Sequence, residues 1–240
     1  MVDDIIKFRI FGERAIELEW PQELSRITLN DIKLTSQLIK VTYGSLIEDL
    51  IPTYTNLLVI YKQPRPLLQE IKNLRDLYHN SELKAQVISN RWYIPVCYDN
   101  LYGLDLEALC QVKKISIGKL IGLHANKDYP IHFYGFLPGF FYLSGLDNQL
   151  HYPRKKTPRT KVVAGSVAIG GAQTGVYPQD SPGGWNIIGA TPIQLFNSKN
   201  LSPVFAKVGD LIHFVPIDRR EFERIKDQGD AYILRKEVIP

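Results

Sequence analysis

Glycine and proline are concentrated in the second half of the chain, and this concentration constrains the fold more than any other feature. Ten of the 17 glycines and six of the 15 prolines in the 240 residues lie between Gly135 and Pro192. Residues 162–196 also carry a single charged side chain, Asp180. Short apolar runs separated by glycine and proline turns are typical of a β-barrel or β-sandwich. Because solvated loops usually carry charge, we interpret these uncharged turns as backbone packed around a pocket or an interface.

The first ninety residues show strand patterns of a different kind. Apolar and charged side chains alternate over residues 7–10 and again over residues 16–20, which predicts a hairpin with one solvated face. Residues 46–51 and 56–61 are predicted as two more strands, and the apolar residues between 85 and 88 suit a returning strand.

Helices are predicted on both sides of residue 90. A capping box at Thr28–Asp31 predicts the start of one helix, and the apolar stripe after Pro66 marks a second. With the strands, they predict helices layered on an antiparallel sheet. Two short helices are expected at 105–112 and 116–124, with Ser116 as an N-cap. We place the domain boundary near Asn90, which gives an α+β protein: a small α/β domain over residues 1–90 and a barrel domain over residues 91–240.

The overall composition excludes several classes of protein. A formal net charge of +4 is too small to indicate a nucleic-acid surface. The chain begins with acidic residues and has no apolar run near the roughly 18–20 residues of a membrane span, so we expect neither a secretory signal nor a membrane partner. Cys97 and Cys110 stand far apart, which favours reduced thiols in the cytoplasm. The scattered histidines predict no metal site, and residues 165–172 lack the lysine of a phosphate-binding P-loop.

Residues 154–161 form a basic segment with five cations in eight positions. The planar guanidinium group of arginine binds a carboxylate or phosphate through two N–H groups, so Arg154 and Arg159 are candidates for anion recognition. A solvated basic loop is the alternative. The position of the segment, directly before the uncharged stretch, favours the functional interpretation.

Two segments that follow combine neutral hydrogen-bonding groups with a large aromatic ring. Their polar side chains, glycines and ring are Gln173, Thr174, Tyr177, Ser181, Gly183, Gly184 and Trp185. The glycines allow close approach of the backbone, and the side chains suit a pocket for a small polar ring or an amide. Tight turns that close a barrel are the alternative. The aromatic run over residues 133–142 is expected to be core.

The motifs that carry these residues resemble one family. In chain order they include Gly135-Phe136-Leu137-Pro138-Gly139-Phe140, Thr157-Pro158-Arg159, Ala164-Gly165-Ser166-Val167, Gln173-Thr174-Gly175-Val176-Tyr177-Pro178, Ser181-Pro182-Gly183-Gly184-Trp185, Thr191-Pro192 and Gly209-Asp210. The chain is similar to the KipI-like family, whose members are known as the B subunit of 5-oxoprolinase, as kinase A inhibitor or as allophanate hydrolase subunit 1. The block of motifs spans about residues 129–216.

This resemblance implies a fold, partners and a reaction. The fold would be a small α/β domain followed by a cyclophilin-like β-barrel, and the chain would be one half of a split carboxyltransferase-type module. The partners would be the A and C subunits of 5-oxoprolinase. Such complexes open the lactam of 5-oxoproline to L-glutamate at the expense of ATP, which this chain alone need not bind. The chain is therefore expected to be an enzyme subunit that is inactive alone.

The resemblance also implies roles for particular residues. The expected catalytic residues are Arg154, Arg159 and Gln173, and the expected substrate-binding residues are Thr174, Tyr177, Ser181, Gly183, Gly184, Trp185 and Thr191. The arginines would offset the charge of the substrate carboxylate or of a transferring phosphoryl group. Val163 and Ala190 depart from the family pattern, and Ala190 removes a cation expected near the pocket.

Two other functions stay open from the sequence. Some members of the family resemble inhibitors of a sensor histidine kinase, which would make the chain a binding module without a catalytic role. Others act on allophanate or related amides with a different partner. A glutamate-release assay separates the three, because only the 5-oxoprolinase hypothesis predicts glutamate from 5-oxoproline.

Overall fold

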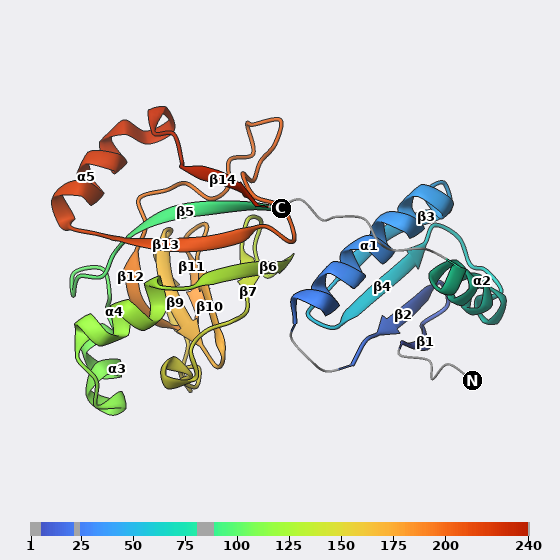
Figure 1. Ribbon diagram of the computed structural model, residues 1–240, viewed down its shortest axis with the longest axis horizontal. Coiled ribbons are helices and arrows are strands. Elements are labelled where there is room, and N and C mark those ends of the chain that lie inside the picture. Colours follow the sequence, from blue (N-terminus) through green and yellow to red (C-terminus); the bar gives the residue numbers. More distant parts are fainter. Residues whose placement is uncertain (1–5, 22–24, 81–88, 240) are drawn as a thin grey trace. The chain divides into compact units, whose positions relative to one another are not determined.

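The structure is a computed structural model that describes residues 6–21, 25–80 and 89–239 (Figure 1). Its contacts divide the chain into two compact units, Met1–Val87 and Ile88–Pro240. Strand β5 (Ser89–Cys97) begins the second unit. Ser89 and Asn90, which the sequence assigned to the first domain, therefore pair within the second unit.

The first unit contains an antiparallel sheet in the order β1-β2-β4-β3. Its strands are β1 (Lys7–Phe11), β2 (Ala15–Glu19), β3 (Ile47–Pro52) and β4 (Asn56–Tyr61). The predicted hairpin is confirmed, with Phe8 opposite Leu18 and Ile10 opposite Ile16. Alternate residues of β4, from Leu57 to Tyr61, are fully buried, which gives the sheet one apolar face.

Two helices pack on this face, α1 (Arg26–Tyr43) and α2 (Leu67–Asn80). Helix α1 begins earlier than the capping box predicted. Ser25 is the N-cap, and its Oγ accepts a hydrogen bond from the backbone N of Thr28 at 3.1 Å. Thr28 therefore lies inside the first turn. The strand predicted at residues 85–88 lies outside the described residues.

The second unit is a closed barrel of seven strands. Around the barrel the order is β12 (Asn186–Ala190), β9 (Ser166–Gly170), β10 (Gln173–Val176), β7 (Phe141–Leu143), β6 (Asp128–Tyr134), β13 (Leu211–Ile217) and β5. The pairing of Ala190 with Cys97 joins β12 to β5 and closes the ring. Strands β13 and β5 run parallel, and β14 (Lys236–Ile239) adds to β5 outside the ring. The predicted barrel is confirmed.

Helices and a small ribbon complete this unit. The helices are α3 (Leu106–Lys113), α4 (Ile117–Ala125), α5 (Arg219–Gln228) and the short η1 (Asn148–Leu150) and η2 (Gly229–Ala231). Ser116 caps α4 as predicted, because its Oγ accepts from the backbone N of Lys119 at 3.1 Å. Strands β8 (Arg159–Val162) and β11 (Ser181–Gly183) form a separate two-stranded ribbon.

Three buried polar side chains of the second unit form a hydrogen-bonded chain. Tyr98 Oη lies 2.7 Å from His124 Nδ1, and His124 Nε2 lies 2.8 Å from Thr174 Oγ1. The Thr174 hydroxyl donates to the carbonyl of Ala168, so it accepts from Nε2–H and leaves Nδ1 to accept from tyrosine. Burial lowers the pKa of His124 to about 3, so the imidazole stays neutral.

A buried carboxylate anchors the start of β5. Asp210 accepts hydrogen bonds from the backbone N of Asn90, the indole Nε1 of Trp92 and the backbone N of Lys207, each at 2.9 Å. The Gly209-Asp210 motif therefore serves the fold of the barrel, since it ties β5 to the turn before β13.

Candidate functional site

A pocket of about 310 Å³ in the second unit brings together much of the candidate site, and we call it the aromatic pocket. Five rings line it: Phe136, Phe140, Tyr142, Tyr177 and Trp185. The other residues that line it are Arg154, Lys155, Pro158, Pro182, Gly183 and Gly184. The volume is at the small end of the range for ligand pockets, about 300–1,000 Å³.

Three buried rings form the floor of the aromatic pocket. Phe140 packs edge to face against Trp185 and Tyr177, with ring centroids 5.6 and 5.7 Å apart. The missing side chain of Gly183 leaves room for the Tyr177 ring, because a Cβ there would lie 2.4 Å from Tyr177 Oη. Gly170 does the same for Trp185, at 2.6 Å. The aromatic run expected to be core is therefore both core and pocket wall.

Phe136 stands at the mouth of the pocket in a strained backbone conformation. Its φ is +66°, in the left-handed region that bulky side chains avoid. The backbone N of Leu137 donates to the carbonyl of Gly135 at 2.8 Å, which makes Phe136 the central residue of a three-residue γ-turn. The residue is 59% exposed, and its ring contacts the edges of Phe140 and Tyr177. Strain of this kind collects at functional sites.

Arg154 supplies the exposed cation of the aromatic pocket. Its guanidinium carbon lies 5.4 Å from the centre of the Trp185 ring, and Nη2 lies 3.4 Å from Oε1 of Gln173. The tryptophan ring and the glutamine amide orient the guanidinium group and leave it without a carboxylate partner among the described residues. It is therefore free to bind an anionic ligand.

A buried aspartate holds two further cations, Lys155 in the pocket wall and Arg159 behind it. Asp105 Oδ1 lies 2.8 Å from Arg159 Nη2 and 2.7 Å from Lys155 Nζ, while Oδ2 accepts from the backbone N of Ile187 at 2.8 Å. Burial alone raises the pKa of Asp105, but these hydrogen bonds outweigh it and leave the pKa below its ordinary value. We call this group the Asp105 clasp. It fixes the segment that presents Arg154.

The charges around the pocket do not cancel. Arg154, Lys155 and Arg159 face one carboxylate, Asp105, so the site is net positive. Nη1 of Arg159 is buried and has no hydrogen-bond partner in the described chain. A site with aromatic walls and with guanidinium N–H groups that have no carboxylate partner is suited to a small ring that carries a carboxylate.

The structure places the predicted site residues in several different settings. Those that line the aromatic pocket are Arg154, Tyr177, Gly183, Gly184 and Trp185. Gln173 contacts Arg154, and Arg159 lies behind the pocket in the clasp. The Ser181 hydroxyl is buried and donates to the carbonyl of Pro182. Thr174 lies inside the barrel, fully buried, and so faces away from the pocket.

Thr191 and the two departures from the family pattern lie elsewhere. Thr191, Val163 and Ala190 line a second and larger cavity of about 850 Å³, which we call the apolar groove. Ala190 is buried against Cys97 and Phe222. Position 190 therefore belongs to the groove and lies outside the residues that line the aromatic pocket.

Sequence reasoning missed two members of the site. Lys155 belongs to the basic segment but carries no mark that separates it from its neighbours, and Asp105 stands out only as the start of a predicted helix. Asp105 is 54 residues from Arg159 and 82 from Ile187 along the chain. The side chain of this N-cap aspartate makes no cap hydrogen bond, which frees it for the clasp, but only the fold reveals that.

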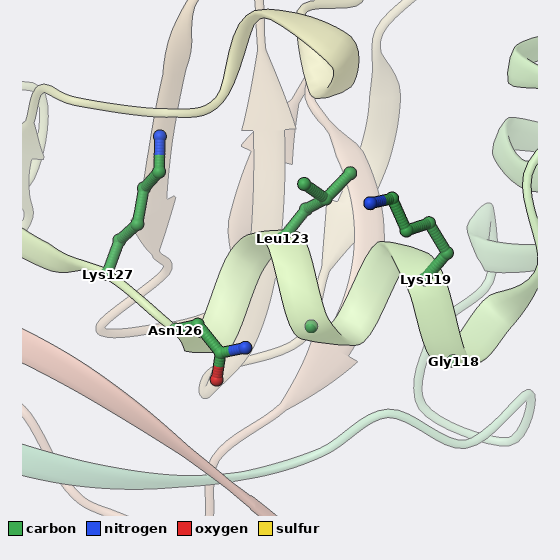
Figure 2. Close-up of a pocket in the computed structure, with 6 residues that line it drawn as sticks. Gly118, Lys119, Leu123, Asn126 and Lys127 are labelled. Carbon is green, nitrogen blue, oxygen red and sulfur yellow. The ribbon is translucent and has the colours of Figure 1, made fainter.

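A further pocket of about 330 Å³ lies along α4 (Figure 2). Its lining residues are Gly118, Lys119, Gly122, Leu123, Asn126 and Lys127, and Lys127 pairs with Asp147 at 3.2 Å. It holds none of the predicted site residues. In the described ranges, no group of His, Cys, Asp or Glu side chains is placed to hold a metal ion, and no helix is long and apolar enough to cross a membrane.

Known proteins are similar in sequence to this chain over most of its length. The family model for the carboxyltransferase domain, subdomain C and D, matches residues 6–206. Three relatives are each named as the B subunit of 5-oxoprolinase. The Escherichia coli O157:H7 protein is 37% identical over 86% of this chain and 94% of its own. The Haemophilus influenzae protein is 40% identical over 68% of this chain and 73% of its own, and the Bacillus subtilis protein 36% over 66% and 65%.

Solved structures share the fold. The crystal structure of TTHA0988 superposes with a TM-score of 0.73 and 29% identity, over 85% of this chain and 40% of that one. The Kluyveromyces lactis urea amidolyase superposes with a TM-score of 0.80 over 98% of this chain and 16% of that one, and its 18% identity supports the fold alone. The chain therefore belongs to the carboxyltransferase subdomain C and D family, within the KipI-like group that contains the B subunits of 5-oxoprolinase.

Proposed function

We propose that this chain is the B subunit of an ATP-dependent 5-oxoprolinase that opens the lactam of 5-oxoproline to L-glutamate together with the A and C subunits. The names of its relatives support a subunit of 5-oxoprolinase. The observation that carries the proposal is the aromatic pocket, where rings packed edge to face and an arginine without a carboxylate partner among the described residues line one small cavity.

The chemistry of 5-oxoproline matches this pocket. The substrate is a flat five-membered lactam with one carboxylate, so it offers a ring face, an amide and an anion. The rings of Phe136, Tyr177 and Trp185 suit the ring face, and the Arg154 guanidinium suits the carboxylate. The pocket therefore offers matching groups to both the ring and the anion.

Opening a lactam needs an activated carbonyl. A lactam carbon is a poor electrophile, and phosphorylation of its oxygen by ATP converts that oxygen into a leaving group. This phosphorylation releases ADP. One water molecule then adds to the carbon, and the C–N bond breaks. A second water molecule displaces the phosphate, which yields glutamate. Cations near the lactam oxygen stabilise the charge that develops there.

The residues of this chain divide that work. We assign Arg154 to the carboxylate, and Arg159, held by Asp105 behind the pocket, to the positive potential that stabilises charge on the lactam oxygen. The glycine-rich segment at 165–172 is strand β9 and the turn to β10, which is unlike the loop before a helix that cradles phosphates. We therefore assign lactam recognition to this pocket and leave ATP to the assembled complex.

A coupled assay tests the proposal. This chain is co-purified with relatives of the A and C subunits, and ADP and glutamate release are measured with 5-oxoproline, with allophanate as the comparison substrate. Glutamate should appear only with all three subunits. Arg159→Ala should lower kcat by about 100-fold or more, the scale expected for loss of a charge-stabilising donor.

The fold should survive this substitution, because Lys155 still pairs with Asp105. Lys156→Ala is the matched control, since Lys156 is an exposed cation of the same segment that does not line the pocket. An intact complex that releases no glutamate from 5-oxoproline would refute the proposal. Full activity in Arg159→Ala would remove this arginine from its assigned role.

A further inference from the structure

The apolar groove is a large cavity in the second unit that the proposed function does not use. Its walls come from five segments: the loop before α3, the end of β8 with the residues that follow it, residues 178–180 before β11, strand β12 with the residues that follow it, and helix α5. At about 850 Å³ it exceeds the aromatic pocket more than twofold. A cavity of this size accommodates several side chains.

Three aliphatic side chains at the mouth of the groove are unusually exposed. Leu101 and Leu104 are each 61% exposed and Val163 is 59% exposed. Apolar residues gathered in this way on a protein surface mark interaction sites more often than scattered ones do.

The loop that carries the two leucines is held firmly in place. The carbonyl of Asp99 accepts hydrogen bonds from the backbone N of Tyr102 and Gly103, and the side chain of Asp99 accepts from the backbone N of Leu101 at 2.8 Å. The Tyr102 ring lies 4.3 Å from the ring of Phe222. The leucines are therefore presented by a preformed surface, which lowers the entropy lost on binding.

The charge of the groove is positive. Its charged lining residues are Lys161, Lys199, Lys226 and one carboxylate, Asp180. Lys161 pairs with Asp180 at 2.8 Å, and Lys226 lies 3.6 Å from Glu223 on the same helix. Lys199 is exposed and forms no ion pair within the described chain. Charge complementarity therefore favours an occupant with a carboxylate.

The groove also contains the free edge of a strand. Strand β8 pairs with β11 on one side, and no other described strand pairs with it. Lys161, Val162 and Val163, at the end of β8 and just beyond it, line the groove. An unpaired edge beside apolar pockets is the surface on which extended peptides bind by adding a strand.

We propose that the apolar groove binds an extended segment of a partner subunit, one with apolar side chains for the leucines and valine and a carboxylate for Lys199. This inference rests on the proposed function for the existence of that complex. In TTHA0988 the region equivalent to this chain is 40% of a longer polypeptide, so there the same fold is joined covalently to further chain. A separate subunit needs a docking surface in its place.

The test is assembly, measured independently of activity. Full-length chain is mixed with the tagged C subunit, and then with the A and C subunits together, and the dissociation constant is measured. Val163→Asp should weaken binding at least tenfold, because it places a charge among the apolar contacts. Val112→Asp is the matched control: Val112 is also a valine, also 59% exposed, on α3 outside the groove, and should change binding less than twofold.

A second variant tests the charge. Lys199→Glu should weaken binding about fivefold and flatten its dependence on salt, and an acidic-to-alanine scan of the partner should find one carboxylate whose loss is not additive with it. Each variant's melting temperature is checked against wild type.

Three results would overturn the inference. Val163→Asp could assemble like wild type, the Lys199 variant could leave the salt dependence unchanged, or the chain alone could form a dimer that Val163→Asp dissociates, which would identify a second copy as the occupant. Failure of the proposed function gives a different pattern, in which wild type and variants still differ in assembly but no glutamate is released.

Discussion

The aromatic pocket and the apolar groove lie toward opposite ends of one ribbon, and they differ in how they hold charge. At one end of the β8–β11 ribbon, Arg159 pairs with the buried Asp105 behind the pocket. Toward the other end, Lys161 pairs with the exposed Asp180 in the groove. The side chain of Asp105 is 9% exposed and that of Asp180 is 50% exposed.

This difference shows what each surface is built to do. A buried carboxylate that holds two cations fixes their positions before any ligand arrives, which suits chemistry on a small molecule. Exposed lysines on flexible stems, beside aliphatic side chains, suit a surface that closes on a macromolecule. The pocket is therefore preorganised for reaction and the groove for association.

The largest expected effect is loss of the buried carboxylate. Asp105→Ala leaves Lys155 and Arg159 without their counter-charge and should lower the free energy of unfolding by about 3 kcal/mol. It should also lower glutamate release at least as much as Arg159→Ala does. Chemical denaturation and the coupled assay measure both. Asp180→Ala is the control and should leave stability nearly unchanged, so equal losses in the two variants would erase the distinction between the surfaces.

Alanine substitutions at two glycines should each affect one surface, measured by KM or by assembly, and leave the other surface unchanged. Gly183→Ala brings a Cβ within 2.4 Å of Tyr177 Oη and should raise the KM for 5-oxoproline about tenfold, the effect of roughly 1.4 kcal/mol in binding, while assembly is unchanged. Gly103→Ala brings a Cβ within 2.7 Å of the Ile188 carbonyl, which shifts the leucine loop, and should weaken assembly without changing KM. Both measurements on both variants are needed. A common effect on KM and assembly would show that the two surfaces are one site.

Phe136 tests whether strain at the pocket serves the ligand. Phe136→Gly removes the ring and accepts a positive φ, whereas Phe136→Ala removes the ring and keeps the strain. The glycine variant should be more stable than the alanine variant by about 1 kcal/mol. Both should raise the KM for 5-oxoproline severalfold, because each loses the ring at the mouth. Unchanged KM values would show that the ring has no part in binding.

The smallest expected effect is a change of stability with pH near neutrality, and it comes from the barrel core, outside both surfaces. The folded pKa of His124 is about 3, below its unfolded value of about 6.5. Its contribution to stability is therefore complete above pH 6.5 and is lost as pH falls toward 3. At pH 6 the loss should be about 1 kcal/mol.

Chemical denaturation between pH 8 and 4 measures how the free energy of unfolding depends on pH. His124→Gln should reduce this dependence and leave the part due to His132, whose pKa burial lowers to about 4, while His79→Gln, at an exposed position on α2, should keep it in full. The Asp105 clasp acts at lower pH, because its folded pKa is depressed below that of an ordinary aspartate. If His124→Gln retained the full dependence, another group would set the acid limit.

Local patterns predicted the elements of this chain, but not how the barrel closes. The hairpin of β1 and β2, the Ser116 cap and the turn-rich strands each follow from neighbouring residues. Closure depends on Ala190 meeting Cys97 and on β13 running parallel to β5, more than a hundred residues away. Such long-range pairings leave no periodic signal in the sequence.

The candidate site was predicted in part for the same reason. The sequence places Gln173 and Thr174 as neighbours in one pocket, but both lie in β10, where successive side chains point to opposite faces. Gln173 therefore reaches Arg154 outside, and Thr174 reaches His124 inside. Asp105 was missed because its partners meet it only in the folded chain.

Direct binding of 5-oxoproline is the measurement that tests the central claim most closely. Labelled 5-oxoproline is equilibrated with the assembled complex containing wild-type chain, Arg154→Ala or the matched Lys156→Ala. The pocket assignment predicts saturable binding that Arg154→Ala weakens at least tenfold and Lys156→Ala changes less than twofold. Equal affinity in all three complexes would contradict it, because the substrate carboxylate would then be held by another site.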